Sequence, residues 1–504
     1  MPMYRDWVPE AVRPWIYLLF ALTFQLTGTY YLGATGQMVG STGLMREDVM
    51  MVGMMGVVGV NMPFPFLFRF KFRFTNHQLL LAAASVIVVC NVATLFTTNV
   101  PVLCAIGYVA GFAKLCGTFE CFSNIRLWIS PKQIFGVFLP SIYIVILGAQ
   151  GLCTWLTQQL TYYYSWQAMN WFMTAVLIVL MLIVMCFTKN FRFMKPLPLV
   201  SLDWLGCLLW STLMVEVIWL FIYGEYYNWT DSPLWRAVAL AVPVTLAVTV
   251  GRMRHIRHPY IEAGLWRHSR LVAILAMFAI AEMMNATPRV LLNTLTGGVL
   301  HWGMMTTTSL NLWEVAGSAL GCGMTIAWTL WVRRPFTQLL TVGFVMLLMH
   351  QVMMYFYVSP TLNVERLVLP TVLRTAGYAV FFSTMTLYLK ELIEFPAFFM
   401  ALTMSGFIRN GVVESVFTGI YSHHLRYFIA DTAARGQHYD LPQTLMIAVK
   451  QSYGWVCIVG LVLLLLMMVY EFQPVRSTVR KMPHLNVLRR TYVKQLRHDR
   501  QAAT

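Results

Sequence analysis

Long apolar runs, separated by short polar segments, recur along the whole chain of 504 residues. A helix needs about 20 mostly apolar residues to cross about 30 Å of hydrocarbon. Runs of this length predict fourteen membrane-spanning helices, because the strands of a membrane barrel are shorter and alternate in polarity. The runs begin near Trp15, Asp48, Leu79, Val102, Ile134, Ser165, Leu202, Leu234, Leu271, Thr306, Phe336, Leu367, Pro396 and Tyr453.

The amino-acid composition points to the same fold class. Of all residues, 58% are hydrophobic and 11% are charged, and the mean hydropathy is +0.64. Soluble domains carry about 25% charged residues, because a solvated surface must cover their core. The sequence therefore predicts an all-α polytopic membrane protein and excludes a water-soluble enzyme, a disordered scaffold and a fibrous repeat. The nine cysteines lie in apolar runs without a CxxC pair, so we expect neither a disulfide framework nor a metal site.

The positive charges are unevenly distributed over the predicted connections. If both ends of the chain are cytoplasmic, 26 of the 36 Lys and Arg residues lie in cytoplasmic segments and six lie outside. Short cytoplasmic loops of membrane proteins carry such an excess, so we expect both termini in the cytoplasm. The same bias accounts for the net charge of +16 without a nucleic-acid partner.

Two segments in the middle of the chain carry motifs of a known family. Asp203-Trp204-Leu205-Gly206 opens the seventh run, which ends in Gly224-Glu225-Tyr226-Tyr227-Asn228-Trp229. His258-Pro259-Tyr260-Ile261 precedes Leu265-Trp266-Arg267 at the entry to the ninth run. With these motifs, and a long connection before the last run, the chain resembles the major facilitator superfamily, in its fourteen-helix drug:proton antiporter branch of the EmrB/QacA type.

The resemblance implies two six-helix bundles joined by two linker helices. The expected parts are a cytoplasmic N-terminus (1–14), an N-terminal six-helix bundle (15–190), two inserted linker helices (202–251), a cytoplasmic loop (252–270), a C-terminal six-helix bundle (271–472) with an outer loop (421–452), and a basic cytoplasmic tail (473–504). The resemblance also implies a bacterial inner membrane, and as partners a periplasmic adaptor and an outer-membrane channel. No cofactor is expected, because the proton motive force would drive transport.

The sequence departs from this family in several places. The first cytoplasmic connection, residues 68–74, reads Phe-Arg-Phe-Lys-Phe-Arg-Phe and lacks the Asp and Gly of the family signature, including the Asp to which the family's latch is attributed. Lys114 replaces the basic residue that the family places earlier in the fourth span. The first span has no acidic residue. It offers Gln25, Tyr30 and Tyr31 as polar groups for a substrate cavity, and Asn285 of the ninth span is a further candidate.

Charged side chains inside the predicted spans are the main candidates for function. An ionisable group at the bilayer centre costs at least about 2.5 kcal/mol, and such groups mark ion or proton pathways. A proton-coupled exporter needs buried carboxylates that load and release protons. The candidate proton-coupling residues, with Glu282 first, are Glu282, Glu314, Glu414 and Glu120, and the candidate charge partners are Arg374, Arg409, Lys114 and Arg289. The alternative is that these groups form static ion pairs that fix helix register.

These observations favour a secondary active exporter of amphipathic or toxic small molecules, working by proton antiport. A major facilitator exporter of an endogenous lipid or siderophore remains an alternative. A membrane-embedded lipid-modifying enzyme is less favoured, because His350, the one His deep in a span, has no acidic neighbour within a turn. Glu216, midway along the seventh run, is expected to contact a partner subunit or to face inward.

Overall fold

The computed structural model describes residues 3–27, 30–132, 134–192, 199, 202–332, 335–435 and 440–472. The chain forms two compact units, Met1–Cys457 and Ile458–Thr504, and of the second unit the end of one helix is described. The described residues are almost entirely helical, and their strand-like pairing is confined to an isolated bridge between Tyr4 and Thr188. The predicted all-α membrane fold is therefore confirmed.

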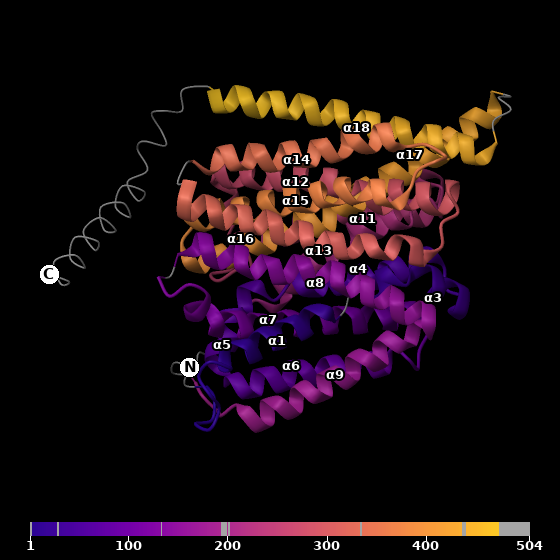
Figure 1. Cartoon of the computed structure of the whole chain (residues 1–504). Coiled ribbons are helices and arrows are strands. Elements are labelled where there is room, and N and C mark those ends of the chain that lie inside the picture. Colours follow the sequence, from indigo (N-terminus) through magenta and orange to yellow (C-terminus); the bar gives the residue numbers. More distant parts are fainter. Residues whose placement is uncertain are drawn as a thin grey trace. The chain divides into compact units, whose positions relative to one another are not determined.

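The first part of the chain forms long helices broken by short connections (Figure 1). These helices are α1 (Arg13–Leu26), α2 (Tyr30–Gly33), α3 (Thr35–Thr42), α4 (Arg46–Asn61), α5 (Leu67–Arg73), α6 (Asn76–Ala93), α7 (Val100–Ile129), α8 (Phe135–Tyr163) and α9 (Trp166–Phe187), with a 3₁₀ turn η1 (Phe64–Phe66) before α5. We refer to α1–α9 as the N-terminal half.

The second part contains the linker helices and the C-terminal half, α12–α18. Its helices are α10 (Trp204–Ile222), α11 (Pro233–His255), α12 (Ser269–Asn285), α13 (Met304–Ala327), α14 (Phe336–Tyr357), α15 (Val364–Leu392), α16 (Phe395–Gly406), α17 (Glu414–Ala434) and α18 (Leu441–Phe472). Shorter 3₁₀ turns are η2 (Trp229–Asp231) and η3 (Ala263–Arg267), and π-helical segments are η4 (Pro288–Leu292), η5 (Thr294–Val299), η6 (Trp328–Val332) and η7 (Phe407–Val413).

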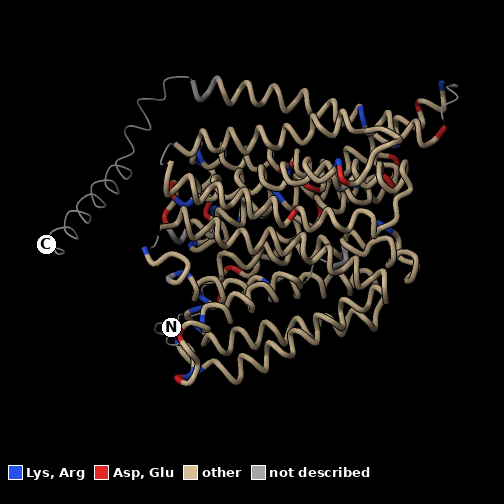
Figure 2. Tube along the Cα trace, in the orientation of Figure 1, with Lys and Arg blue, Asp and Glu red and all other residues tan. Residues whose placement is uncertain are grey.

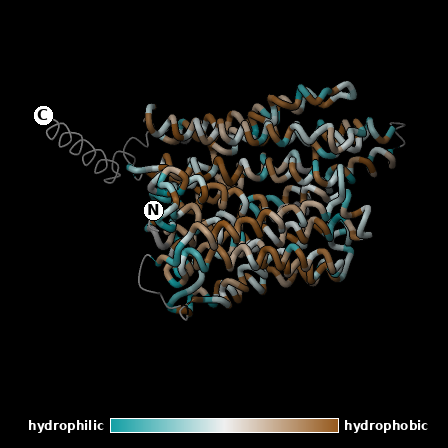
Figure 3. Tube along the Cα trace, turned by 60° about the horizontal axis from the view of Figure 1, so that its bottom comes forward, coloured by the Kyte–Doolittle hydropathy of each residue, from teal (hydrophilic) through white to brown (hydrophobic). Residues whose placement is uncertain are grey.

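Among the described residues, twelve helices are long and apolar enough to cross a membrane, so the predicted count of fourteen is not confirmed. The two remaining predicted spans are helical but fall short of this test. The first is α1, which has 14 residues. The second is the continuous run α16–η7–α17, in which Arg409, Asn410 and Glu414 interrupt the apolar sequence. The hydropathy colouring of Figure 3 shows brown along the helices and more teal at their ends.

The segment 421–452, predicted as an outer loop, is helical for most of its length. Helix α17 continues to Ala434, and α18 begins at Leu441. Near the end of this segment lies an apolar stretch, residues 445–449, in which the side chains of Ala448 and Val449 are fully buried within the first unit. The apolar character of this stretch is therefore accounted for by packing inside the chain.

Glycines allow several helices to approach at backbone distance. A Cβ atom at Gly59 of α4 would overlap the Tyr108 carbonyl of α7, and one at Gly111 of α7 would overlap the Gly56 carbonyl. In the C-terminal half, Gly321 of α13 lies in the same way against the Ala376 carbonyl of α15. Small residues at such crossings let membrane helices pack closely, since the lipid supplies no hydrophobic driving force between them.

The two linker helices are packed differently. Helix α10 buries Trp210 and Met214 against η7, where Trp210 lies edge-on to Phe407 with ring centres 5.2 Å apart. In the most apolar 18-residue stretch of α11, 6% of the residues are buried within the chain, so this helix faces mainly lipid. Asp203 caps α10 by accepting from the Gly206 amide at 2.9 Å, and Arg252 at the end of α11 donates to it at 2.7 Å. Asp203 therefore joins the two linker helices.

Candidate functional site

The carboxylate of Glu282 lies at the centre of a polar network in the C-terminal half. Its side chain, on α12, is 5% exposed. Tyr378 of α15 donates a hydrogen bond of 2.8 Å to Oε2, and Asn285 donates one of 3.2 Å to Oε1. The Nε atom of Arg409 lies 3.9 Å from Oε2. Three groups from three elements thus surround one buried carboxylate.

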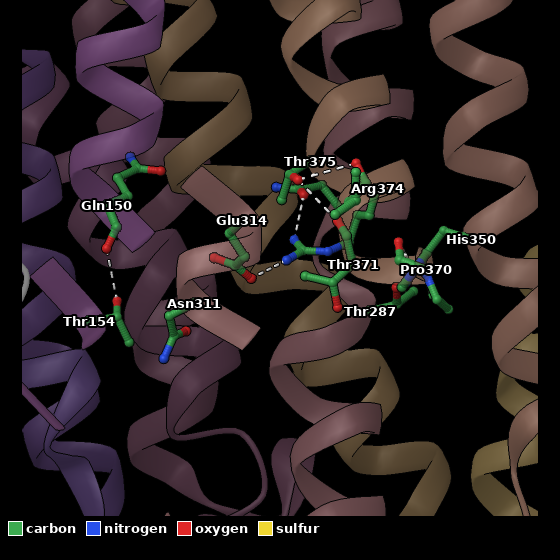
Figure 4. A network of polar contacts seen from close by, with 12 residues as sticks. Gln150, Thr154, Thr287, Asn311, Glu314, His350, Pro370, Thr371, Arg374 and Thr375 are labelled. Carbon is green, nitrogen blue, oxygen red and sulfur yellow. Dashed lines mark hydrogen bonds and ion pairs between the residues drawn. The ribbon is translucent and has the colours of Figure 1, made fainter. Parts of the chain in front are cut away.

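Arg374 of α15 extends this network to a second carboxylate (Figure 4). One end of its guanidinium forms an ion pair with Glu314 of α13, and the other donates to the Asn285 amide oxygen at 2.9 Å. The Glu314 side chain is 31% exposed, whereas that of Arg374 is 11% exposed. Asn285 therefore bridges the two acidic residues, because it donates to Glu282 and accepts from Arg374.

Arg409 lies in a π-helical segment and against an aromatic ring. The segment is η7, and π-helical turns occur frequently at functional sites. The guanidinium carbon of Arg409 is 4.2 Å from the centre of the Phe382 ring, and its Nε donates to Asn410 at 2.8 Å. The buried Nη1 has no hydrogen-bond partner among the residues that the structure describes. Arg409 is therefore the least satisfied cation of the network.

A proline explains the neighbouring break in helix α12. Pro288 has no N–H, so the Met284 carbonyl, four residues earlier, loses its helical donor. Gln351 of α14 supplies the missing donor, with Nε2 at 2.8 Å from that carbonyl and 3.1 Å from Thr287 Oγ1. The chain then continues as the π-helices η4 and η5. Glu282 and Asn285 thus lie directly before a backbone distortion that a buried side chain supports.

Lys114 forms a separate site in the N-terminal half. Its ammonium donates to the backbone carbonyls of Gln25 at 3.0 Å and Thr27 at 2.7 Å, at the end of α1. A cation at a helix C-terminus is stabilised by the carbonyls that have no helical donor there. The Gln25 side chain, a predicted cavity residue, donates instead to Thr118 of α7 at 3.0 Å.

Glu120 also lies in the N-terminal half and does not pair with Lys114. Its carboxylate, 2% exposed, accepts from Lys71 of α5 at 3.2 Å and from Asn124 at 2.8 Å. The Lys71 ammonium further contacts Ser123 at 2.5 Å. Lys71 thus comes from the connection whose sequence departs from the family signature.

The predicted residues are therefore divided among several places. The structure brings together Glu282, Glu314, Asn285, Arg374 and Arg409. Glu414 begins α17 directly after η7, about one helical turn beyond Arg409. The side chains of Arg289, Tyr30 and Tyr31 lie outside the described residues.

Four further features were not predicted from the sequence. Tyr378 and Lys71 were missed because their partners are distant in sequence. Gln351 could have been predicted, because Pro288 leaves the Met284 carbonyl without its helical donor, and a buried amide side chain is a suitable donor. Glu216 accepts from Thr245 of α11 at 2.9 Å, so this carboxylate lies between the two linker helices.

The chain matches no protein-family model and no curated protein. Solved structures do resemble it. A mutant of the peptide transporter POT superimposes with a TM-score of 0.59 at 14% identity, covering 92% of this chain and 96% of that chain. A mutant of the nucleoside transporter NupG gives 0.57 at 10% identity, covering 90% and 98%. PepTSo2 gives 0.59 at 11% identity, covering 92% and 98%.

These similarities establish the fold. The chain has the major facilitator fold and is a multi-pass membrane protein, as the sequence predicted. The solved structures named here are transporters of nucleosides and peptides, so they support the fold and leave the drug:proton antiporter branch a prediction.

Proposed function

We propose that this protein is a proton-coupled secondary transporter in which Glu282 carries the proton. The observation that carries the proposal is a chain of alternating acidic and basic groups, placed on α13, α15, α12 and η7: Glu314, Arg374, Glu282 and Arg409. The neutral amide of Asn285 joins Arg374 to Glu282. An arrangement that only fixes the register of two helices would need one ion pair. This one joins four elements and leaves Arg409 partly unsatisfied.

The separation of 3.9 Å between Glu282 and Arg409 supports an exchange mechanism. When Glu282 is ionised, attraction in the low-dielectric interior draws Arg409 toward it. When Glu282 binds a proton, that attraction is lost, and Arg409 retains its contacts with Phe382 and Asn410. Protonation would thus change the free-energy difference between two arrangements of η7 and α12. A change in populations of this kind is what couples proton binding to alternating access.

Aromatic side chains beside the network support an amphipathic cargo. Tyr143 of α8 lies 4.5 Å from Phe382 between ring centres, and Phe278 lies 5.8 Å from the same ring. Aromatic rings from both halves of the chain therefore converge next to the charges. Flat apolar molecules stack on such rings. We propose export of amphipathic or toxic small molecules from the cytoplasm across a bacterial inner membrane, with both chain ends cytoplasmic and with a periplasmic adaptor and an outer-membrane channel as partners.

The test is proton movement in proteoliposomes that contain the purified protein and a trapped pH-sensitive dye. The probes are ethidium, an amphipathic cation, and deoxycholate, an amphipathic anion. We expect at least one of them to cause proton movement that the empty liposomes lack. Transport of a probe without any proton movement would contradict the proposal. Mass spectrometry of ligands that copurify distinguishes drug export from export of an endogenous lipid or siderophore.

A further inference from the structure

The connection of residues 68–74 lacks the family signature, but its phenylalanines give it a structural role. Phe68 and Phe72 of α5 lie one turn apart with stacked rings, 6.1 Å between centres, and form one face of this short helix. Phe70 of α5 and Phe66 of the preceding turn η1 form a second surface, where both rings lie against Trp204 at the start of the linker. The repeated phenylalanines therefore serve two surfaces.

The face that contains Phe68 contacts the C-terminal half of the chain. The Phe68 ring lies edge-on to Phe399 of α16 with ring centres 4.6 Å apart. Phe119 of α7 lies 5.5 Å from Phe68 and 5.7 Å from Phe399, again edge-on. The Phe68–Phe119–Phe399 triad thus joins α5 and α7 to α16, at the end of the helices where Figure 1 shows α5, α16 and the N-terminus.

The neighbouring cation is held within the N-terminal half. Lys71 donates to Glu120, Ser123 and Asn124, which all belong to α7. Its side chain is 9% exposed. Lys71 therefore fixes α5 on α7 and so orients Phe68 toward Phe399, while the contact across the two halves is made by the rings.

We infer that the Phe68–Phe119–Phe399 triad is a contact that holds the halves together at this end, and that its opening is a step of the transport cycle. Two further contacts join the halves beside it: the Lys390 ammonium lies 5.3 Å from the centre of the Phe135 ring, and Thr329 donates to the Gly136 carbonyl at 3.3 Å. The inference rests on the proposed function, because alternating access requires the halves to separate at one end at a time. Edge-to-face aromatic contacts are strong enough to favour a closed state and weak enough to break on a working time scale. Phe399 is the decisive residue of the triad, since its removal breaks both ring contacts by which the triad crosses between the halves.

The experiment measures the distance between spin labels placed on either side of the triad. Arg73→Cys at the end of α5 and Glu394→Cys before α16 are both exposed positions, and the exposed Cys186 is replaced by Ser. We expect one distance population for the parent protein. In Phe399→Ala a second, longer population should appear, with the open-to-closed ratio raised on the order of tenfold.

Phe398→Ala is the matched control, because Phe398 is buried beside Phe399 and is a residue of α16 outside the triad. A distance distribution for Phe399→Ala that equals the parent, or an equal change in Phe398→Ala, would overturn the inference. Phe68→Ala and the double variant complete a cycle in which the two changes should not add. The distances do not depend on cargo. A triad that opens as expected in a protein without cargo-driven proton movement would preserve this inference and contradict the proposed coupling.

Discussion

The Nε atom of Arg409 lies 3.9 Å from Oε2 of Glu282, while its guanidinium stacks on Phe382 at 4.2 Å. The arginine is thus shared between a carboxylate and an aromatic ring. In Figure 2, red and blue positions occur midway along the helices, among many residues that are neither Lys, Arg, Asp nor Glu. A cation with two competing partners suits a site whose charge changes during the cycle.

Tyr378 should contribute to the state of Glu282 through one hydrogen bond. Tyr378→Phe removes the 2.8 Å bond to Oε2 and keeps the ring, which stacks on Phe382. A hydrogen bond to a charged group contributes about 1.5–3 kcal/mol, so we expect transport driven by a pH gradient to fall at least several-fold. The measurement is probe uptake by proteoliposomes. Tyr427→Phe, at an exposed position, should leave uptake unchanged. Unaltered uptake in Tyr378→Phe would remove this residue from the mechanism.

Arg374 should be more important for folding than either of its partners. Arg374→Met leaves Glu314 and Asn285 without their donor, and loss of one member of a mostly buried pair costs about 2–3 kcal/mol after allowance for the exposure of Glu314. Thermal unfolding in detergent should show a lower midpoint. The double variant Arg374→Met/Glu314→Gln should recover part of the loss, because it removes the unpaired charge. A double variant less stable than Arg374→Met would show that the pair is not the cause.

Gln351 should stabilise the distorted end of α12. Gln351→Leu removes the amide donor at 2.8 Å and leaves the Met284 carbonyl with the Thr287 hydroxyl, which donates to it at 2.9 Å. The loss of one such hydrogen bond costs about 0.5–1.5 kcal/mol. The thermal midpoint should fall. Gln338→Leu, at an exposed position of the same helix, provides the comparison and should leave the midpoint almost unchanged. Equal effects of the two substitutions would show that Gln351 does not support the break at Pro288.

Asp203 should hold the linker helices together. Asp203→Asn weakens the ion pair with Arg252 but keeps a side-chain oxygen that can accept from the Gly206 amide. We expect a loss of about 1 kcal/mol, since Arg252 is 29% exposed and water screens the pair. Protease cleavage in the connection that follows α11, residues 256–262, should become faster, because it lies next to Arg252. Asp231→Asn, an exposed change in the same linker, should not alter the cleavage rate.

The positions of the helices could be predicted because lipid imposes a simple requirement on composition. Helix α7, expected to begin near Val102, begins at Val100, and α14 begins at Phe336 as predicted. The pairing of the charges could not be predicted in the same way. Glu120 pairs with Lys71 and not with Lys114, although Lys114 lies six residues from it on the same helix. Such choices depend on the rotation and crossing of helices, which apolar runs leave undetermined.

The π-helical segments were also beyond sequence reasoning. A π-helical turn contains an extra residue, which leaves no signature in the amino-acid composition. Apart from Arg409 and Asn410, the residues of η7 are apolar side chains and a glycine. The helical structure of the segment 421–452, predicted as an outer loop, was not foreseen for a related reason. Its polar residues, including His423 and Arg426, lie on the exposed side of α17, where they are compatible with a helix that continues beyond the apolar run.

The most direct test of proton coupling compares two transport modes of Glu282→Gln in proteoliposomes. One mode is probe accumulation driven by a pH gradient, and the other is exchange of labelled for unlabelled probe without a gradient. If Glu282 carries the coupled proton, the variant should lose gradient-driven accumulation and retain exchange, because the amide has nearly the same shape and keeps one acceptor oxygen but cannot ionise. Glu365→Gln, an exposed change on α15, should retain both modes. Gradient-driven accumulation by Glu282→Gln at the parent level would contradict the account.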